Sequence, residues 1–139
     1  MGLFDIFKKN KTLREEENDR ASLKEAMKWN KMWELWEVEQ AKSPYQELMT
    51  YQSEVNNGGH SQFFFNLGSI KKISTTVKTV LTVLPPKLAH NLEQAYSVYN
   101  KYNKTDEDKM EKILDGCDEV FFANEEKINE ILEKYADTL

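Results

Sequence analysis

The sequence predicts an all-α protein, a single compact domain of about six or seven helices. Apolar residues recur at three- and four-residue spacing through most of the chain. Capping residues, glycines and prolines divide it into segments of helical length. Residues 70–84 alone alternate like a strand, and a lone strand would leave its backbone hydrogen bonds unsatisfied, so we assign them to a helix as well.

The composition fits one folded domain. The chain has 139 residues, 40% of them hydrophobic and 31% charged, which is enough apolar material for one core. The single cysteine, Cys117, excludes an intramolecular disulfide and favours a reducing compartment. No segment approaches the roughly eighteen consecutive apolar residues of a membrane span, and the start lacks the pattern of a secretory signal. We therefore expect a cytoplasmic protein without a transmembrane segment.

The net charge of -5 is unevenly distributed. Residues 1–31 carry eight Lys/Arg and six Asp/Glu, a net of +2, and residues 32–102 carry six of each. Residues 103–139 carry five Lys and twelve Asp/Glu, a net of -7. Direct nucleic-acid binding is not expected from an acidic surface, whereas a basic protein partner is. Solubility alone is the other explanation of the acidic end.

Residues 1–11 form a short amphipathic N-terminal segment, and residues 12–139 form the helical domain. Leu3, Phe4, Ile6 and Phe7 precede three lysines. This pattern is typical of an anchor on a membrane surface, but also of a short terminal helix docked on the domain or of a frayed end. Ile6 breaks the N-myristoylation pattern.

The first half of the domain reads as three helical segments. Residues 12–42 carry a stripe with Trp29, Trp33 and Trp36 at helical spacing, which favours the core over a ligand platform. Ser43 and Pro44 are a helix cap and first position, and this second helix should end at Asn57-Gly58-Gly59. A short helical turn over residues 60–66 should follow.

The second half reads as four helices. Residues 70–84 and a helix that starts at Pro85-Pro86 come first. Thr105 is the expected cap of the next helix, and Asn124 the expected cap of the last one. The inner face of the helix after Thr105 should consist of Met110, Ile113, Leu114, Cys117, Val120 and Phe121.

The stretch from Glu54 to Asn66 is the most specific feature of the chain. It joins a double Asn, a double Gly and three Phe, and its candidate site residues are Glu54, Asn56, Asn57, Gly58, Gly59, Gln62, Phe63 and Phe64. One interpretation is a folding staple, in which glycines reverse the chain, Phe63 and Phe64 enter the core and the amides satisfy open helix ends. The other is a small polar pocket, in which Glu54, Asn56, Asn57, His60 and Gln62 converge on a ligand.

This stretch, Glu-Val-Asn-Asn-Gly-Gly-x-x-Gln-Phe-Phe, resembles the signature of a bacterial DNA-mimic-protein-like family, a domain of unknown function. Two further segments resemble the family: the Leu/Ala-rich helix from Leu88 to Tyr99, and a closing pattern of Asp118, Phe121, Phe122, Glu126, Leu132 and Tyr135. The resemblance covers residues 30–137. It implies an all-α fold, a bacterial cytoplasmic context, and surface carboxylates that imitate DNA phosphates and capture DNA-binding proteins. No family motif fixes which carboxylates do so.

The sequence itself supplies candidates for that role. They are Asp108, Glu111, Asp115, Asp118, Glu119, Glu125 and Glu126, opposite the apolar face of their helices. The leading hypothesis is a non-enzymatic interaction module that captures a protein, such as a basic DNA-binding one, through acidic C-terminal helices. The alternative is a ligand-binding or enzymatic site at the Asn-Asn-Gly-Gly turn.

Few residues suggest catalysis or a cofactor. His60 and His90 have no neighbour at metal-ligand spacing, Cys117 lies on an apolar face, and no nucleotide or nucleophile motif occurs. We predict no metal, no cofactor and no catalytic residue. Four lysines between residues 71 and 87, with no acid from Val55 to Leu92, could bind an anion or the acidic end of a second copy in a homodimer.

Overall fold

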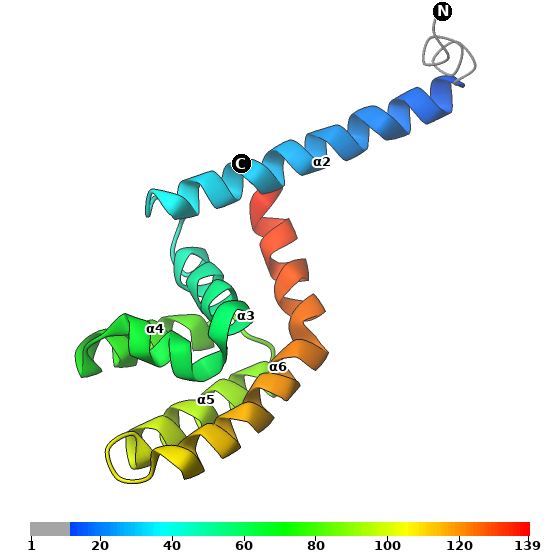
Figure 1. Cartoon of the computed structure of the whole chain (residues 1–139). Coiled ribbons are helices and arrows are strands. Elements are labelled where there is room, and N and C mark those ends of the chain that lie inside the picture. Colours follow the sequence, from blue (N-terminus) through cyan, green and yellow to red (C-terminus); the bar gives the residue numbers. More distant parts are fainter. Residues whose placement is uncertain (1–11) are drawn as a thin grey trace, which may run out of the picture.

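The computed structural model describes residues 12–139, which form five helices (Figure 1). They are α2 (Leu13–Glu37), α3 (Tyr45–Leu67), α4 (Ile70–Leu81), α5 (Pro86–Tyr102) and α6 (Glu107–Ala136). The all-α prediction is confirmed, and residues 12–139 contain no strand. The expected number of six or seven helices is wrong for these residues, because two expected boundaries do not separate helices. The expectation for residues 1–11 lies outside the described residues.

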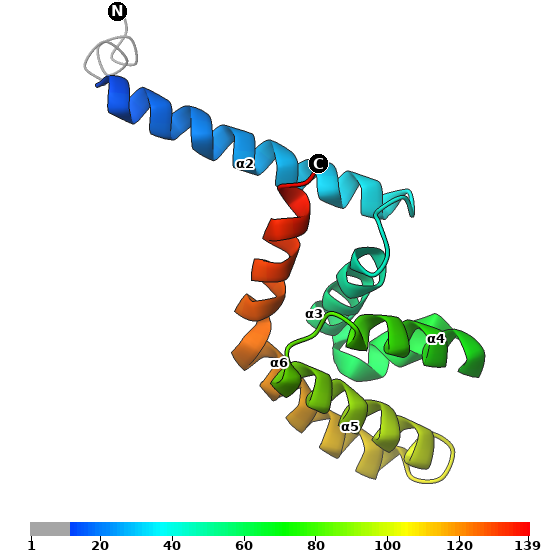
Figure 2. The same ribbon diagram turned by 180° about the vertical axis from the view of Figure 1, so that it is seen from behind.

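The helices pack around α6, the longest of them. α5 and the first half of α6 run side by side as an antiparallel pair, and α3 packs on α6 from another side (Figures 1 and 2). α4 contacts both α3 and α5. α2 crosses the C-terminal end of α6, and its N-terminal half extends away from the body (Figure 2). No helix in residues 12–139 has the length and apolarity that a membrane crossing requires.

α2 begins as the sequence predicts and ends five residues early. The Thr12 hydroxyl accepts a hydrogen bond from the Glu15 amide, and the Glu15 carboxylate accepts one from the Thr12 amide. The helix ends at Glu37 because Glu39 adopts a positive φ of 57°. The Gln40 amide then donates to Leu35 O and the Glu39 amide to Trp36 O, as in a Schellman motif. A glutamate stands where glycine is usual, so the sequence carried no stop signal.

α3 contains the expected glycine turn but continues beyond it. Its first helical residue is Tyr45, and the Ser43 hydroxyl bonds to Glu47 rather than capping the helix backbone. Gly58 and Gly59 have non-helical backbone angles that kink α3. Helical structure resumes at once and ends at Leu67, so the predicted turn over residues 60–66 is the second limb of α3.

α4 settles the helix-or-strand ambiguity of residues 70–84 in favour of a helix. Ser69 caps it by accepting from the Lys72 amide. Thr75 and Thr79 donate their hydroxyls to backbone oxygens four residues earlier, so these strand-favouring residues are accommodated on a helix. α5 starts at Pro86, in agreement with the prediction.

α6 runs without interruption where two helices were predicted. Asp106, not Thr105, caps it by accepting from the Lys109 amide. Asn124 is not a helix cap, because its side chain donates to Val120 O, one turn earlier in the same helix. No proline lies between Glu107 and Ala136, so the helical structure continues through the bend near the middle of α6 (Figures 1 and 2).

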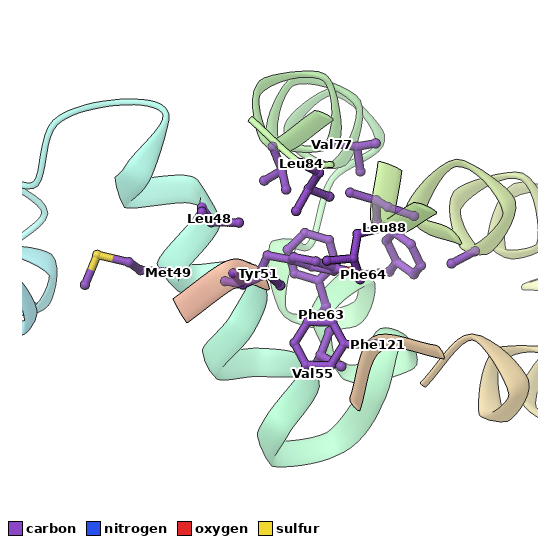
Figure 3. Packing of buried hydrophobic residues seen from close by; sticks show 14 of the residues in the cluster. Leu48, Met49, Tyr51, Val55, Phe63, Phe64, Val77, Leu84, Leu88 and Phe121 are labelled. Carbon is purple, nitrogen blue, oxygen red and sulfur yellow. The ribbon is translucent and has the colours of Figure 1, made fainter. Parts of the chain in front are cut away.

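The core gathers the inner faces of α3 to α6. Tyr51, Phe63, Phe64 and Phe121 are fully buried, with aliphatic residues of α4 and α5 beside them (Figure 3). Burial of Phe63 and Phe64 was predicted, and each contributes about 1.5–3 kcal/mol. In α2 the buried hydrophobic residue is Met32. The three tryptophans, predicted as core, are half-buried and pack against its edge.

Candidate functional site

The glycine kink brings the α3 backbone against α6. Gly59 has φ 77° and ψ -177°, a conformation that side chains disfavour. A Cβ on Gly59 would lie 3.0 Å from Asp118 Cγ. Gly58 is in extended backbone, but a Cβ there would lie 2.9 Å from the Cβ of Gln62. The two glycines therefore permit both the kink and the close approach of Asp118.

A buried chain of hydrogen bonds crosses from α6 to α3 at this point. Asp118 Oδ1 accepts from the His60 amide at 2.9 Å and lies 2.5 Å from His60 Nδ1. A carboxylate only accepts, so Nδ1 carries the proton. His60 Nε2 then accepts from the Tyr51 hydroxyl at 2.7 Å. Burial, followed by the charge of Asp118, raises the pKa of the Tyr51 phenol well above its usual value.

The order carboxylate, imidazole, hydroxyl is that of a nucleophilic triad. Tyr51 and His60 are both fully buried, and the rings of Phe63 and Phe121 lie against Tyr51. A substrate cannot reach this hydroxyl. We interpret the chain as a polar network that fixes the kink of α3 on α6.

Two carboxylates bind four side-chain amides in and beside the signature stretch. Glu125 Oε2 accepts from Asn56 Nδ2 at 2.6 Å and from Gln52 Nε2 at 3.0 Å. Glu54 Oε2 accepts from Gln62 Nε2 at 2.9 Å and from Asn66 Nδ2 at 2.7 Å. The first pair joins α3 to α6, and the second ties the two limbs of α3 together.

The structure divides the signature residues among three places. His60 lies in the buried network, Asn56 lies with Glu125, and Gln62 lies with Glu54. Asn57 is exposed on the surface of the kink. These side chains do not face one common pocket. Gln52 and Tyr51, which sequence reasoning did not single out for the site, are central to these bonds, and only their helical spacing from Asn56 and Val55 hinted at this.

The candidate acidic residues all lie on α6, and they fall into two groups. Glu111 accepts from Ser61 Oγ at 2.6 Å, and Asp118 and Glu125 bind α3 as described. Asp118 and Glu125 are partly buried where the helices pack, whereas Glu111 is exposed and bonds to Ser61 at the surface. The other four are exposed to solvent: Asp108, Asp115, Glu119 and Glu126.

The exposed carboxylates continue along one face of α6, which we call the acidic stripe. Its members are Asp108, Asp115, Glu119, Glu126, Glu130, Glu133 and Asp137, all exposed and spaced by three, four or seven residues. Phe122, 49% exposed, occupies the position between Glu119 and Glu126. Lys127 and Glu130 form an ion pair at 3.7 Å, and Asp137 lies 3.9 Å from Lys28 on α2. The stripe is thus a solvated anionic surface with a single exposed aromatic residue.

A metal centre is not part of this arrangement. Among residues 12–139, no group of three or more His, Cys, Asp or Glu side chains is placed to hold a metal ion. Cys117 is buried, and burial raises the pKa of its thiol, which makes the thiolate unfavourable.

The protein is thus a small all-helical domain with a signature helix kinked at two glycines and a long helix that carries a row of exposed carboxylates. The chain belongs to the DMP19-like protein family, whose family model matches residues 37–139. The match covers 103 of the 139 residues and begins at the last residue of α2, so it starts later than the expected residue 30. Neither the curated proteins nor the solved structures compared with this chain gave a significant match.

Proposed function

We propose that this protein is a non-enzymatic interaction module that captures a basic DNA-binding protein through the acidic stripe. The observation that carries the proposal is the stripe itself, on a domain of a family named for a DNA mimic. From Asp108 to Asp137 it extends about 44 Å along the helix, at 1.5 Å per residue. This is a path length, because α6 bends near its middle and the stripe follows that bend (Figure 1).

The charge density of the stripe is lower than that of DNA. Seven carboxylates over this length give about one per 7 Å, whereas one DNA strand carries one phosphate per 3.4 Å or so. Lys109, Lys112, Lys127 and Lys134 lie on the same helix and weaken its field. The stripe should therefore satisfy only part of the phosphate contacts of its partner. We expect reversible capture that weakens as salt screens the charges.

The carboxylates bound to α3 cannot serve as phosphate substitutes without loss of packing. Charge reversal at Asp118 or Glu125 would break bonds to His60, Gln52 and Asn56. Asp115, Glu119 and Glu126 make no such bonds in residues 12–139 and are the residues to test.

The test is capture by the purified full chain from a bacterial lysate, with a duplex of about 30 base pairs as competitor. We expect the wild type to retain DNA-binding proteins that the duplex displaces. The triple variant Asp115→Lys, Glu119→Lys, Glu126→Lys should lose them while its circular dichroism and unfolding midpoint stay close to wild type. A matched control, Glu17→Lys, Glu34→Lys, Glu37→Lys, makes the same charge change on α2 and should capture normally. Capture that survives the α6 reversals, or that duplex DNA leaves unaffected, would refute the proposal.

A ligand-binding or enzymatic site at the Asn-Asn-Gly-Gly turn is less well supported. The hydroxyl and imidazole of the buried network are closed to substrate, and the amides of Asn56 and Gln62 are engaged with carboxylates. We propose that the signature stretch holds α3 on α6 and leaves recognition to the outer face of α6.

A further inference from the structure

A second surface feature lies where α2 meets the family domain. Trp29 and Trp33 of α2, Gln52 and Asn56 of α3 and Asn129 of α6 line an open hollow of about 450 Å³. The tryptophans are one helical turn apart, their ring centroids are 6.3 Å apart, and both side chains are partly exposed. The two tryptophans precede residue 37, so this hollow depends on a helix outside the family match.

Gln52 leaves an acceptor unused at the edge of this hollow. Its side-chain nitrogen donates to Glu125 Oε2 at 3.0 Å and to Asn129 Oδ1 at 2.8 Å. These two acceptors fix the orientation of the amide, because the reverse orientation would place its oxygen against theirs. Gln52 is only 5% exposed, and its Oε1 has no hydrogen-bond partner within residues 12–139. A buried carbonyl oxygen without a donor is unfavourable, and because this oxygen is closed to solvent, a donor from a ligand in the hollow reaches it only if the Gln52 side chain moves.

The charges around the hollow select the sign of that ligand. Glu125 lies behind Gln52, and Glu133 and Asp137 adjoin Trp29 in a neighbouring depression. Of the α2 lysines, Lys28 lies 3.9 Å from Asp137, and Lys24 and Lys31 border a different depression that Glu34 also lines. Carboxylates therefore predominate, and an anionic ligand is disfavoured.

Aromatic faces, an unused oxygen and negative surroundings together match one chemical group. A guanidinium is planar, positively charged, stacks on tryptophan and carries five N–H donors with no acceptor. A lysine ammonium has the charge but cannot stack as a plane. We propose that this hollow binds an arginine side chain of the basic partner protein. That the arginine comes from such a partner rests on the function proposed above. It would place a specific contact beside the less specific acidic stripe.

The hollow can be tested without any partner. Nα-acetyl-arginine amide is titrated into the full-length protein and followed by two-dimensional NMR of the indole and side-chain amide groups. We expect saturable shifts at the Trp29, Trp33, Gln52 and Asn129 signals, with half-saturation in the millimolar range. The Trp36 indole N–H, bonded to Thr50 Oγ1 at 2.9 Å, should remain in place as an internal reference. Nα-acetyl-lysine amide should bind at least about tenfold more weakly.

Two variants address the residues of the hollow. Trp33→Leu removes a stacking face and should weaken arginine binding by about tenfold or more. Gln52→Met removes the unused oxygen together with the Nε2 donor to Glu125 and Asn129, and if it unfolds the protein, Trp33→Leu alone decides the test. Phe122→Leu, an exposed aromatic residue on α6 away from the hollow, is the matched control and should bind as wild type. Equal binding of the two amino-acid amides, or the absence of saturable shifts at these signals, would overturn the proposal.

The outcome separates this inference from the function it extends. Arginine binding without DNA-displaceable capture would refute the proposed function and leave the guanidinium site. Capture that duplex DNA displaces, without arginine binding, would refute the guanidinium site and leave the proposed function.

Discussion

At Gly59 a backbone requirement and a packing requirement fall on the same residue. Its positive φ disfavours any side chain, and its α-carbon faces the Asp118 carboxylate. Asp118 in turn binds the backbone and the ring of His60. The signature glycine therefore serves the joint between α3 and α6 more directly than it serves a ligand.

Gly59→Ala should destabilise the protein by about 2–3 kcal/mol, because it adds backbone strain and displaces Asp118. Urea unfolding measures the change. Gly116→Ala is the matched control, since a Cβ there meets nothing within 4 Å and Gly116 lies inside α6. That change should stabilise the protein by about 0.5–1 kcal/mol. Similar effects of the two substitutions would contradict the role given to Gly59.

The raised pKa of Tyr51 predicts a loss of stability in alkaline solution. In the folded state the phenol keeps its proton above its ordinary pKa of about 10, whereas the unfolded chain releases it there. The unfolded state then binds fewer protons than the native state, so stability is complete below about pH 10 and falls above it, by up to about 1.4 kcal/mol per pH unit.

Tyr51→Phe should remove this part of the pH dependence, although the variant starts from lower stability because His60 Nε2 loses its donor. Urea unfolding of both proteins from about pH 8 to pH 11 gives the comparison. The buried Cys117 thiol also has a raised pKa, and because it is present in both proteins, only its interaction with Tyr51 enters their difference. Parallel stability curves would show that Tyr51 does not titrate differently in the two states.

At the scale of the helices, local signals predicted where α2, α4 and α5 begin, but several other boundaries differ from the prediction. Thr12, Ser69 and Pro86 begin helices as their residue types predict. The end of α2 depends on a positive φ at Glu39, held where Gln46 Nε2 donates to Trp36 O, and no local pattern announces it. Asn124 looked like a cap, yet inside a helix its side chain can bond one turn back. The sequence pattern therefore gave too many helices.

For the candidate site, the sequence predicted the acidic face but not the role of each carboxylate. The periodicity of residues 108–137 predicted a polar acidic face, and the exposed members of the stripe lie there. Periodicity could not separate Asp118 and Glu125, which bind α3, from Asp115 and Glu119, which face solvent. That distinction depends on where α3 lies, and it required the structure.

At the scale of the whole molecule, α2 lies outside the residues that the family model matches, except for Glu37. It is attached through Met32, the half-buried tryptophans and a hydrogen bond from Trp36 Nε1 to Thr50. Its N-terminal half projects from the body and exposes Leu13, Leu23 and Met27 (Figure 1). A helical segment as short as this N-terminal half is only marginally stable in water when it packs against nothing. The two halves of α2 should thus differ in stability.

Met32→Ala should loosen α2 without unfolding the domain, because Met32 is fully buried and its truncation leaves a cavity. Hydrogen exchange by mass spectrometry should show faster exchange over residues 29–37, with α3 to α6 still protected. Met27→Ala, at a residue that is 63% exposed, is the control and should change little. Loss of protection throughout the chain would mean that α2 is integral to the domain.

The division of α6 into an inner and an outer face also bears on how such a protein can diverge. Its inner carboxylates are tied to the signature helix, whereas substitutions among the outer ones leave those ties intact. Charge spacing on the outer face can therefore drift one residue at a time while the fold persists. A related protein could therefore change its binding partner through a series of substitutions in which every intermediate sequence still folds.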